Sequence, residues 1–102
     1  MGIEAILENE QGEKQDILID KSDVLRNFIE SRHEDFLRNT KCLQFIDPCG
    51  NSVFNSLQKP FLLYELNEVL KLIKPEDRSY FCDLINLVKK IQTHLYLKFY
   101  GD

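Results

Sequence analysis

The sequence predicts an α+β fold in which a small, mainly antiparallel sheet of about four strands carries three helices on one face. Two observations lead to this prediction. Segments with the two-residue period of strands stand near both ends of the chain, and two long segments with a helical period stand between them. The resulting order is β-β-α-β-α-α-β. With 102 residues, of which 43% are hydrophobic and 29% are charged, the chain fits a single domain spanning residues 1–102.

The N-terminal part predicts a β-hairpin followed by a helix. Residues 3–9 favour a strand with Ile3, Ala5 and Leu7 on one face, residues 16–20 favour a second strand, and Gly12 marks the turn between them. Apolar side chains then recur at helical spacing over residues 23–31, behind Ser22, which is a favourable N-cap. This first helix is expected to pack its apolar stripe on the sheet.

The segment before the two long helices predicts a short strand, a tight turn and a minimal return strand. Phe36 and Leu37 are expected to close over the core from a loop. Residues 42–46 are a short, mostly apolar run that favours a strand. Asp, Pro and Gly at the first, second and fourth positions of residues 47–50 are typical of a type I turn, after which residues 52–54 can return beside the strand.

Proline introduces each of two long helical segments. Pro60 opens residues 60–73 and Pro75 opens residues 75–92. Proline is favoured at the first helical position because the N–H that it lacks would have no partner there. Each segment has an apolar stripe along one side. Because almost no linker separates them, we expect an angled or antiparallel helix pair.

The clearest strand in the chain lies at residues 95–100. Leu95, Leu97 and Phe99 alternate with more polar side chains, so one face of the strand is apolar. This pattern predicts a strand deep in the sheet, with its apolar face toward the core.

The composition and charge indicate which partners and which cellular location to expect. The net charge of −4 repels phosphate backbones, so a nucleic acid is not an expected partner, whereas a basic protein surface is. No apolar run reaches the ~18 residues of a membrane-spanning helix, and the N-terminus lacks the pattern of a secretory signal. A cytoplasmic protein without a membrane partner is therefore expected. The odd count of three cysteines, without a C-x-x-C pair, predicts reduced thiols.

The sequence contains no catalytic or metal-binding signature. Its two histidines, His33 and His94, have no second ligand at helical spacing, and its four isolated glycines form no phosphate-binding loop. Cys49 lies in the turn and is expected to be exposed, whereas Cys42 and Cys82 stand in apolar contexts and are expected to be packed. No cofactor and no metal are expected.

The turn at residues 47–55 is the main candidate site. Asp47, Asn51 and Asn55 could converge as a polar binding site. Each can also satisfy backbone groups through Asx-type turns and a helix cap, and this structural interpretation is the simpler one. Phe54 is either a core residue, the more common fate of an aromatic side chain in a small domain, or an exposed anchor for a partner.

The turn and the C-terminal strand share a pattern with known sequences. In the turn the residues that carry it are Ile46, Asp47, Gly50, Phe54, Asn55, Gln58 and Pro60, and in the strand they are Leu95, Tyr96, Leu97, Lys98, Phe99, Gly101 and Asp102. With these residues the chain resembles a group of small, stand-alone bacterial proteins of uncharacterised function, whose turn reads I-D-x-x-G-D-T-x-F-N-x-x-Q and whose final strand reads L-Y-L-K-F-x-G-D. The chain departs from that pattern with Asn51 for the acidic residue and Ser52 for the threonine. The resemblance implies a complete domain and carries no reaction or catalytic residue.

From these features we expect a small, non-catalytic binding protein that acts by protein–protein interaction. Blocking a toxin, as an immunity protein does, and masking a partner, as a regulator does, are roles of this kind. The small size, the negative charge and the missing catalytic set favour it. The alternative, which the sequence leaves open, is a small enzyme or small-ligand-binding protein with a polar site at the turn from Asp47 to Asn55, with His94 as a further member.

Overall fold

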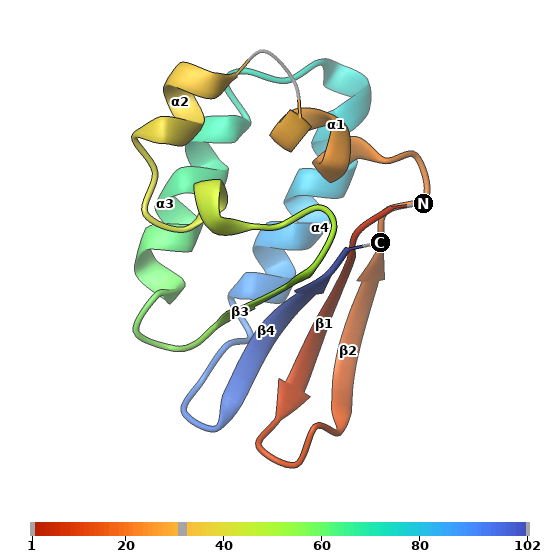
Figure 1. Cartoon of the computed structure of the whole chain (residues 1–102), viewed down its shortest axis with the longest axis vertical. Coiled ribbons are helices and arrows are strands. Elements are labelled where there is room, and N and C mark those ends of the chain that lie inside the picture. Colours follow the sequence, from red (N-terminus) through yellow and green to blue (C-terminus); the bar gives the residue numbers. More distant parts are fainter. Residues whose placement is uncertain (1, 31–32, 102) are drawn as a thin grey trace.

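The computed structural model describes residues 2–30 and 33–101, which form one four-stranded antiparallel sheet with helices packed against it (Figure 1). The strands are β1 (Glu4–Asn9), β2 (Lys14–Ile19), β3 (Asn51–Phe54) and β4 (Leu95–Tyr100). Their order in the sheet is β2-β1-β4-β3. The predicted α+β class with a four-stranded antiparallel sheet is confirmed.

The described residues contain four α-helices where the sequence predicts three. They are α1 (Val24–Glu30), α2 (Glu34–Arg38), α3 (Lys59–Val69) and α4 (Arg78–Val88), with short 3-10 turns η1 (Leu43–Phe45) and η2 (Pro75–Asp77). The additional helix is α2, which replaces a predicted loop, because five residues are too few to show a helical period. None of these helices is both long and apolar enough to cross a bilayer.

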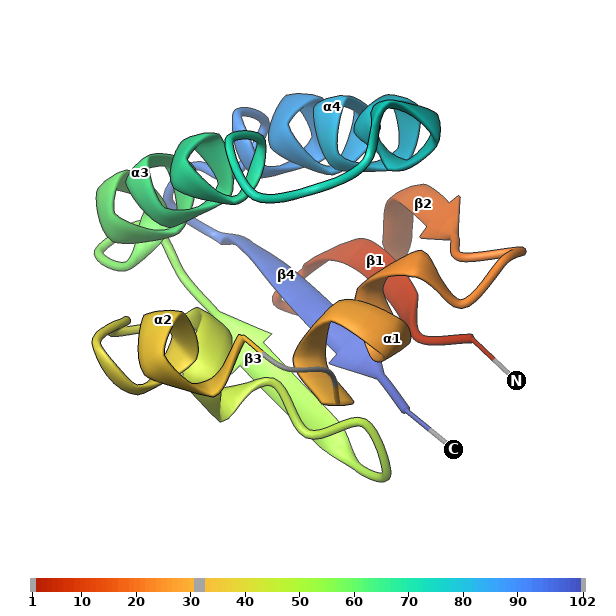
Figure 2. The same ribbon diagram turned by 90° about the horizontal axis from the view of Figure 1, so that it is seen from above.

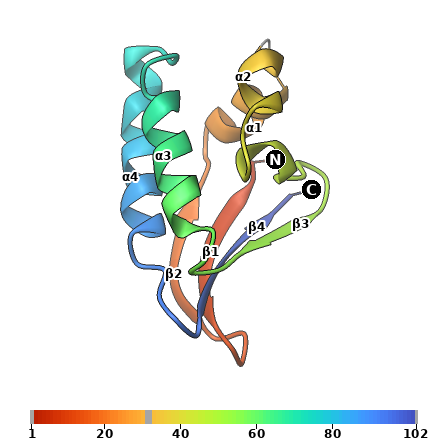
Figure 3. The same ribbon diagram turned by 90° about the vertical axis from the view of Figure 1, so that its left-hand side faces the viewer.

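The helices cover one face of the sheet, as predicted. α3 and α4 lie side by side against it, and α1 and α2 close the same core at one end (Figures 2 and 3). On this face, Ala5 and Leu7 of β1, Phe54 of β3, and Leu97 and Phe99 of β4 are at most 3% exposed and belong to one cluster with the helix side chains. Among the described residues, no helix covers the opposite face.

β4 lies between β1 and β3, which confirms that this strand is deep in the sheet. It pairs with β1 along six residues and with β3 along four. Leu97 and Phe99 have no exposed surface. The last strand in the sequence therefore joins the N-terminal hairpin to the short edge strand β3.

The strand predicted at residues 42–46 is wrong. These residues form η1 and its flanks, and the extended strand comes only after the turn, where the sequence predicts a minimal return strand. The backbone N–H groups of Lys41, Cys42 and Leu43 donate to the Glu65 carboxylate of α3, at 2.6, 3.1 and 3.0 Å. Because a side chain satisfies them, these groups do not join a strand ladder.

Candidate functional site

The turn at residues 47–50 satisfies hydrogen-bonding groups of its own backbone. The N–H of Gly50 donates to the carbonyl of Asp47 at 3.3 Å, which closes the four-residue turn. The exposed Asp47 carboxylate accepts the N–H of Cys49 at 2.8 Å, and the N–H of Asp47 donates to the Ser52 hydroxyl at 2.9 Å. Asp47 therefore has the local, Asx-type role that its position allows.

Two distant segments hold this turn in place. Arg26 of α1 donates to the carbonyl of Pro48 at 2.7 Å, and the N–H of Gly101 donates to the carbonyl of Gly50 at 2.7 Å. Gly101 lies so close to the turn that a Cβ at its position would overlap the carbonyl group of Pro48. The turn and the end of β4, which carry the sequence resemblance, are thus in direct contact.

Asn55 caps the helical turn that leads into α3. Its side-chain oxygen accepts the N–H of Leu57 at 2.9 Å, and its own N–H donates to the side-chain oxygen of Gln58 at 2.9 Å. This reciprocal pair has the arrangement of a capping box, in which two otherwise unpaired N–H groups are satisfied by side chains. Asn55 therefore has a structural role at the start of α3.

The structure does not bring the four predicted site residues together. Phe54 is 3% exposed and its ring meets that of Phe99 edge-on, with centroids 5.7 Å apart, so Phe54 is a core residue. Asn51 begins β3 and is exposed. Asp47 precedes β3 and Asn55 follows it, so a four-residue strand of about 13 Å separates them.

Asn55 instead shares a shallow cavity with His94. The cavity has a volume of about 230 Å³ and is also lined by Glu10, whose carboxylate contacts Nδ1 of His94. Both members of this pair are exposed, so the pair is worth little stabilisation. Within residues 2–30 and 33–101, no group of three or more His, Cys, Asp and Glu side chains could hold a metal ion. The alternative polar site thus keeps Asn55 and His94 without Asp47.

Replacing the capping side chains is expected to lower stability and leave the fold intact. Asp47→Ala and Asn55→Ala should each cost about 1 kcal/mol of unfolding free energy, up to ~2, because each removes a cap. Phe54→Ala should cost about 3–5 kcal/mol because it empties part of the core. Urea unfolding measures all of these values, with the exposed Asn51→Ala as a near-neutral control. Asp47 and Asn55 variants as stable as wild type would contradict the structural role and favour a functional one.

The three cysteines differ in accessibility. Cys49 is exposed, as expected of a turn residue. The expected packing of Cys82 is wrong: this side chain is exposed because it lies off the apolar stripe of α4. Cys42 is buried, and burial raises the pKa of its thiol to about 11, with a further contribution from the Glu65 carboxylate. A thiol with so high a pKa is a poor nucleophile at neutral pH.

A groove between α2 and α3, which the sequence alone does not reveal, brings aromatic side chains to the surface. This aromatic groove has a volume of about 440 Å³ and is lined by Phe36, Asn39, Thr40, Lys41, Phe61, Tyr64, Glu65 and Glu68. Phe61 is 45% exposed and Tyr64 is 68% exposed. The Lys41 ammonium lies over the Phe61 ring, 4.5 Å from its centroid. The groove therefore combines apolar walls with charged groups.

Glu65 fixes the position of one wall of this groove. Glu65 is 6% exposed, and its carboxylate accepts the three N–H groups of residues 41–43, so it holds the segment before η1 against α3. This contact places Lys41 beside Phe61. A charged residue between Leu62 and Leu66 on the apolar stripe of α3 is the sequence signal that could have revealed it.

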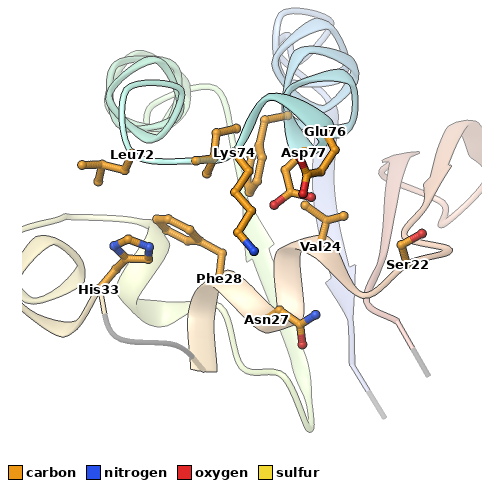
Figure 4. Close-up of a pocket in the computed structure, with 11 residues that line it drawn as sticks. Ser22, Val24, Asn27, Phe28, His33, Leu72, Lys74, Glu76 and Asp77 are labelled. Atoms are coloured by element: carbon orange, nitrogen blue, oxygen red, sulfur yellow. The ribbon is translucent and has the colours of Figure 1, made fainter.

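A second cavity lies between α1 and the connection from α3 to α4 (Figure 4). Its volume is about 370 Å³. Lys74, Glu76 and Asp77 of the connection and Asn27 of α1 supply its polar groups, and Phe28 supplies part of its apolar wall. This cavity is more polar than the aromatic groove and suits a different kind of ligand.

Comparisons of the chain with protein-family models, with curated proteins and with solved structures found no match.

Proposed function

We propose that the chain is a small, non-catalytic cytoplasmic protein that binds another protein through the aromatic groove, as an immunity protein or a regulator does. The observation that carries the proposal is the exposure of Phe61 and Tyr64 on the outer side of α3, beside Phe36 of α2. Aromatic side chains are enriched in protein interfaces, where a few of them supply most of the binding energy. These three side chains are therefore the anchors of the proposed interface.

Exposed apolar surface continues along α3 beyond the groove. Phe61 and Tyr64 stand three residues apart and so share one side of the helix. Leu57, in the turn before α3, is 79% exposed, and Leu72, in the turn after it, is 45% exposed. The 11 residues of α3 extend over about 16 Å, which is long enough to support a helix or an extended segment of a partner.

The charges of the groove favour a basic partner. Its lining contains two carboxylates, Glu65 and Glu68, against the single ammonium of Lys41, and the whole chain has a net charge of −4. Lys71 pairs with Glu68 at 2.8 Å, but such an exposed pair is weak and easily exchanged. The partner segment that we propose inserts an apolar side chain beside Phe61 and directs a Lys or Arg toward Glu68.

An enzymatic or ligand-binding role at the turn is the second candidate and has less support. Asp47 and Asn55 are occupied with backbone N–H groups and lie at opposite ends of β3. The pair of His94 and Glu10 is exposed, without the water-excluding surroundings that make such a pair effective in catalysis.

The proposed interface can be tested with a photo-reactive residue. Benzoylphenylalanine in place of Tyr64 should cross-link one partner protein in the native host. The partner identified in this way is then purified without the cross-link, and its affinity for this protein is measured by titration calorimetry. Tyr64→Asp is expected to weaken binding at least about 30-fold, because losing an aromatic anchor costs ~2 kcal/mol or more. The affinity for wild type should fall with added salt, since the partner is basic.

Val53 provides the matched control. It is an apolar side chain that is 51% exposed, on the sheet face opposite the helices. Benzoylphenylalanine at position 53 should not cross-link the partner, and Val53→Asp should leave the affinity unchanged. If Val53→Asp abolishes binding and Tyr64→Asp does not, the interface lies on the sheet. Failure of position 64 to cross-link any protein would contradict the proposal.

A further inference from the structure

The cavity between α1 and the α3–α4 connection has the dimensions of a small-molecule site (Figure 4). Its volume of about 370 Å³ lies at the lower end of the range of about 300–1,000 Å³ that is usual for ligand sites. It shares no lining residue with the aromatic groove itself, but Leu72, at the far end of the apolar surface along α3, lines it.

One wall of this cavity is apolar and well ordered by packing. Phe28 of α1 is 6% exposed and Phe81 of α4 is 1% exposed, and their rings meet edge-on with centroids 5.7 Å apart. The imidazole of His33 stacks on Phe28, with centroids 4.7 Å apart. Together with Val24 and Leu72, the latter 45% exposed, these packed rings form an apolar wall against which an aliphatic or aromatic group can rest.

The other side of the cavity presents opposite charges that do not neutralise each other. Lys74, Glu76 and Asp77 project from the α3–α4 connection toward α1 (Figure 4). Among residues 2–30 and 33–101, none of these three side chains has a hydrogen-bond or ion-pair partner, although they are close in sequence. By contrast, Lys59 donates to two backbone carbonyls at 2.8 Å, and Lys71 pairs with Glu68. The charged groups of the cavity are therefore available to a ligand.

We propose that this cavity binds a free α-amino acid with an apolar side chain. The carboxylate of the amino acid accepts hydrogen bonds from the Lys74 ammonium, and its ammonium group donates to the carboxylates of Asp77 and Glu76. Its side chain lies against Phe28. Lys74 and Glu76 are exposed and Asp77 is half-buried, so water solvates them when no ligand is bound. A zwitterion can pair with both kinds of charge at once, whereas a simple anion or a simple cation pairs with only one.

Binding is tested by titrating the protein with L-leucine, L-phenylalanine and L-methionine in turn, followed by NMR chemical shifts. At least one of them is expected to bind saturably with a dissociation constant below about 10 mM. For leucine, 4-methylpentanoate lacks the ammonium group and 3-methylbutylamine lacks the carboxylate, and each should bind at least tenfold more weakly. The proposal is overturned if none of the three amino acids saturates the protein, or if these analogues bind as tightly as leucine.

Two variants assign the charges of the ligand to residues of the cavity. Lys74→Gln should weaken the binding of leucine at least tenfold. It should leave the binding of 3-methylbutylamine unaffected, because that amine has no carboxylate for Lys74 to bind. Asp77→Asn should weaken the binding of leucine and leave the binding of 4-methylpentanoate unaffected, because that acid has no ammonium group for Asp77 to bind. Lys71→Gln, which removes a nearby ammonium that is engaged with Glu68, should change nothing. The assignment would be overturned if both variants lost the same affinity for every ligand, or if Lys71→Gln lost affinity for leucine.

Discussion

Deletion of residues 95–102 is expected to leave a chain that does not fold. The deletion removes β4, which bonds to both β1 and β3, and with it Leu97 and Phe99, which have no exposed surface. Truncating two fully buried side chains costs roughly 5–10 kcal/mol. A domain has only about 5–15 kcal/mol of unfolding free energy in total, and β3 would also lose β4, the strand with which it pairs.

Circular dichroism and thermal unfolding measure this result. The truncated protein should show no cooperative transition, and its near-ultraviolet spectrum should lack the signal of packed aromatic rings. Tyr96→Ala is the matched control, because Tyr96 lies on the same strand but on the half-exposed face, and it should retain a cooperative melt. A native-like, cooperative melt of the truncated protein would contradict the central role of β4.

Glu65→Ala is expected to lower the unfolding free energy by about 3–5 kcal/mol, because three N–H groups, two of them buried, lose their acceptor at once. The carboxylate accepts from Lys41, Cys42 and Leu43 and is 6% exposed, so water does not readily replace it. Glu65→Gln should be less damaging, since one amide oxygen can still accept from Cys42 and Leu43, and the NH2 group faces only the N–H of Lys41.

Urea unfolding provides the measurement, with Glu68→Ala as the control. Glu68 lies one turn further along α3 and pairs with the exposed Lys71, so its loss should cost no more than about 0.5 kcal/mol. A much larger loss of unfolding free energy in Glu65→Ala than in Glu68→Ala would show that the Glu65 carboxylate has a buried structural role, whereas that of Glu68 does not. A Glu65→Ala variant within about 1 kcal/mol of wild type would mean that residues 41–43 find other acceptors.

The elements predicted correctly are those whose signal is local. The alternation of Leu95, Leu97 and Phe99 depends only on the strand itself, and the capping roles of Asp47 and Asn55 depend on atoms two or three residues away. The strand predicted at residues 42–46 fails for the opposite reason. The N–H groups of Cys42 and Leu43 are taken by a carboxylate 23 and 22 residues further along the chain, and no periodicity within five residues can reveal that.

The candidate sites also differ in whether their residues are close in the sequence or only in the folded structure. The turn attracts attention because its residues are adjacent in sequence, yet in space β3 holds Asp47 and Asn55 apart. The aromatic groove needs Phe36 from a five-residue helix, Lys41 from the following segment and Tyr64 from α3, which only the tertiary structure brings together. The sequence could have shown that Phe61 and Tyr64 lie off the apolar stripe of α3, but not what they face.

The central place of β4 delays completion of the sheet until this strand has been synthesised. β1 can pair with β2 as soon as both have left the ribosome, but its other edge stays open until β4, nearly the whole chain later, has been made. Until then, Ala5 and Leu7 and the apolar sides of α3 and α4 have only part of their sheet to pack against. Until β4 pairs with β1 and β3, these apolar surfaces stay partly exposed, so the sheet and its helices are expected to reach their final packing together.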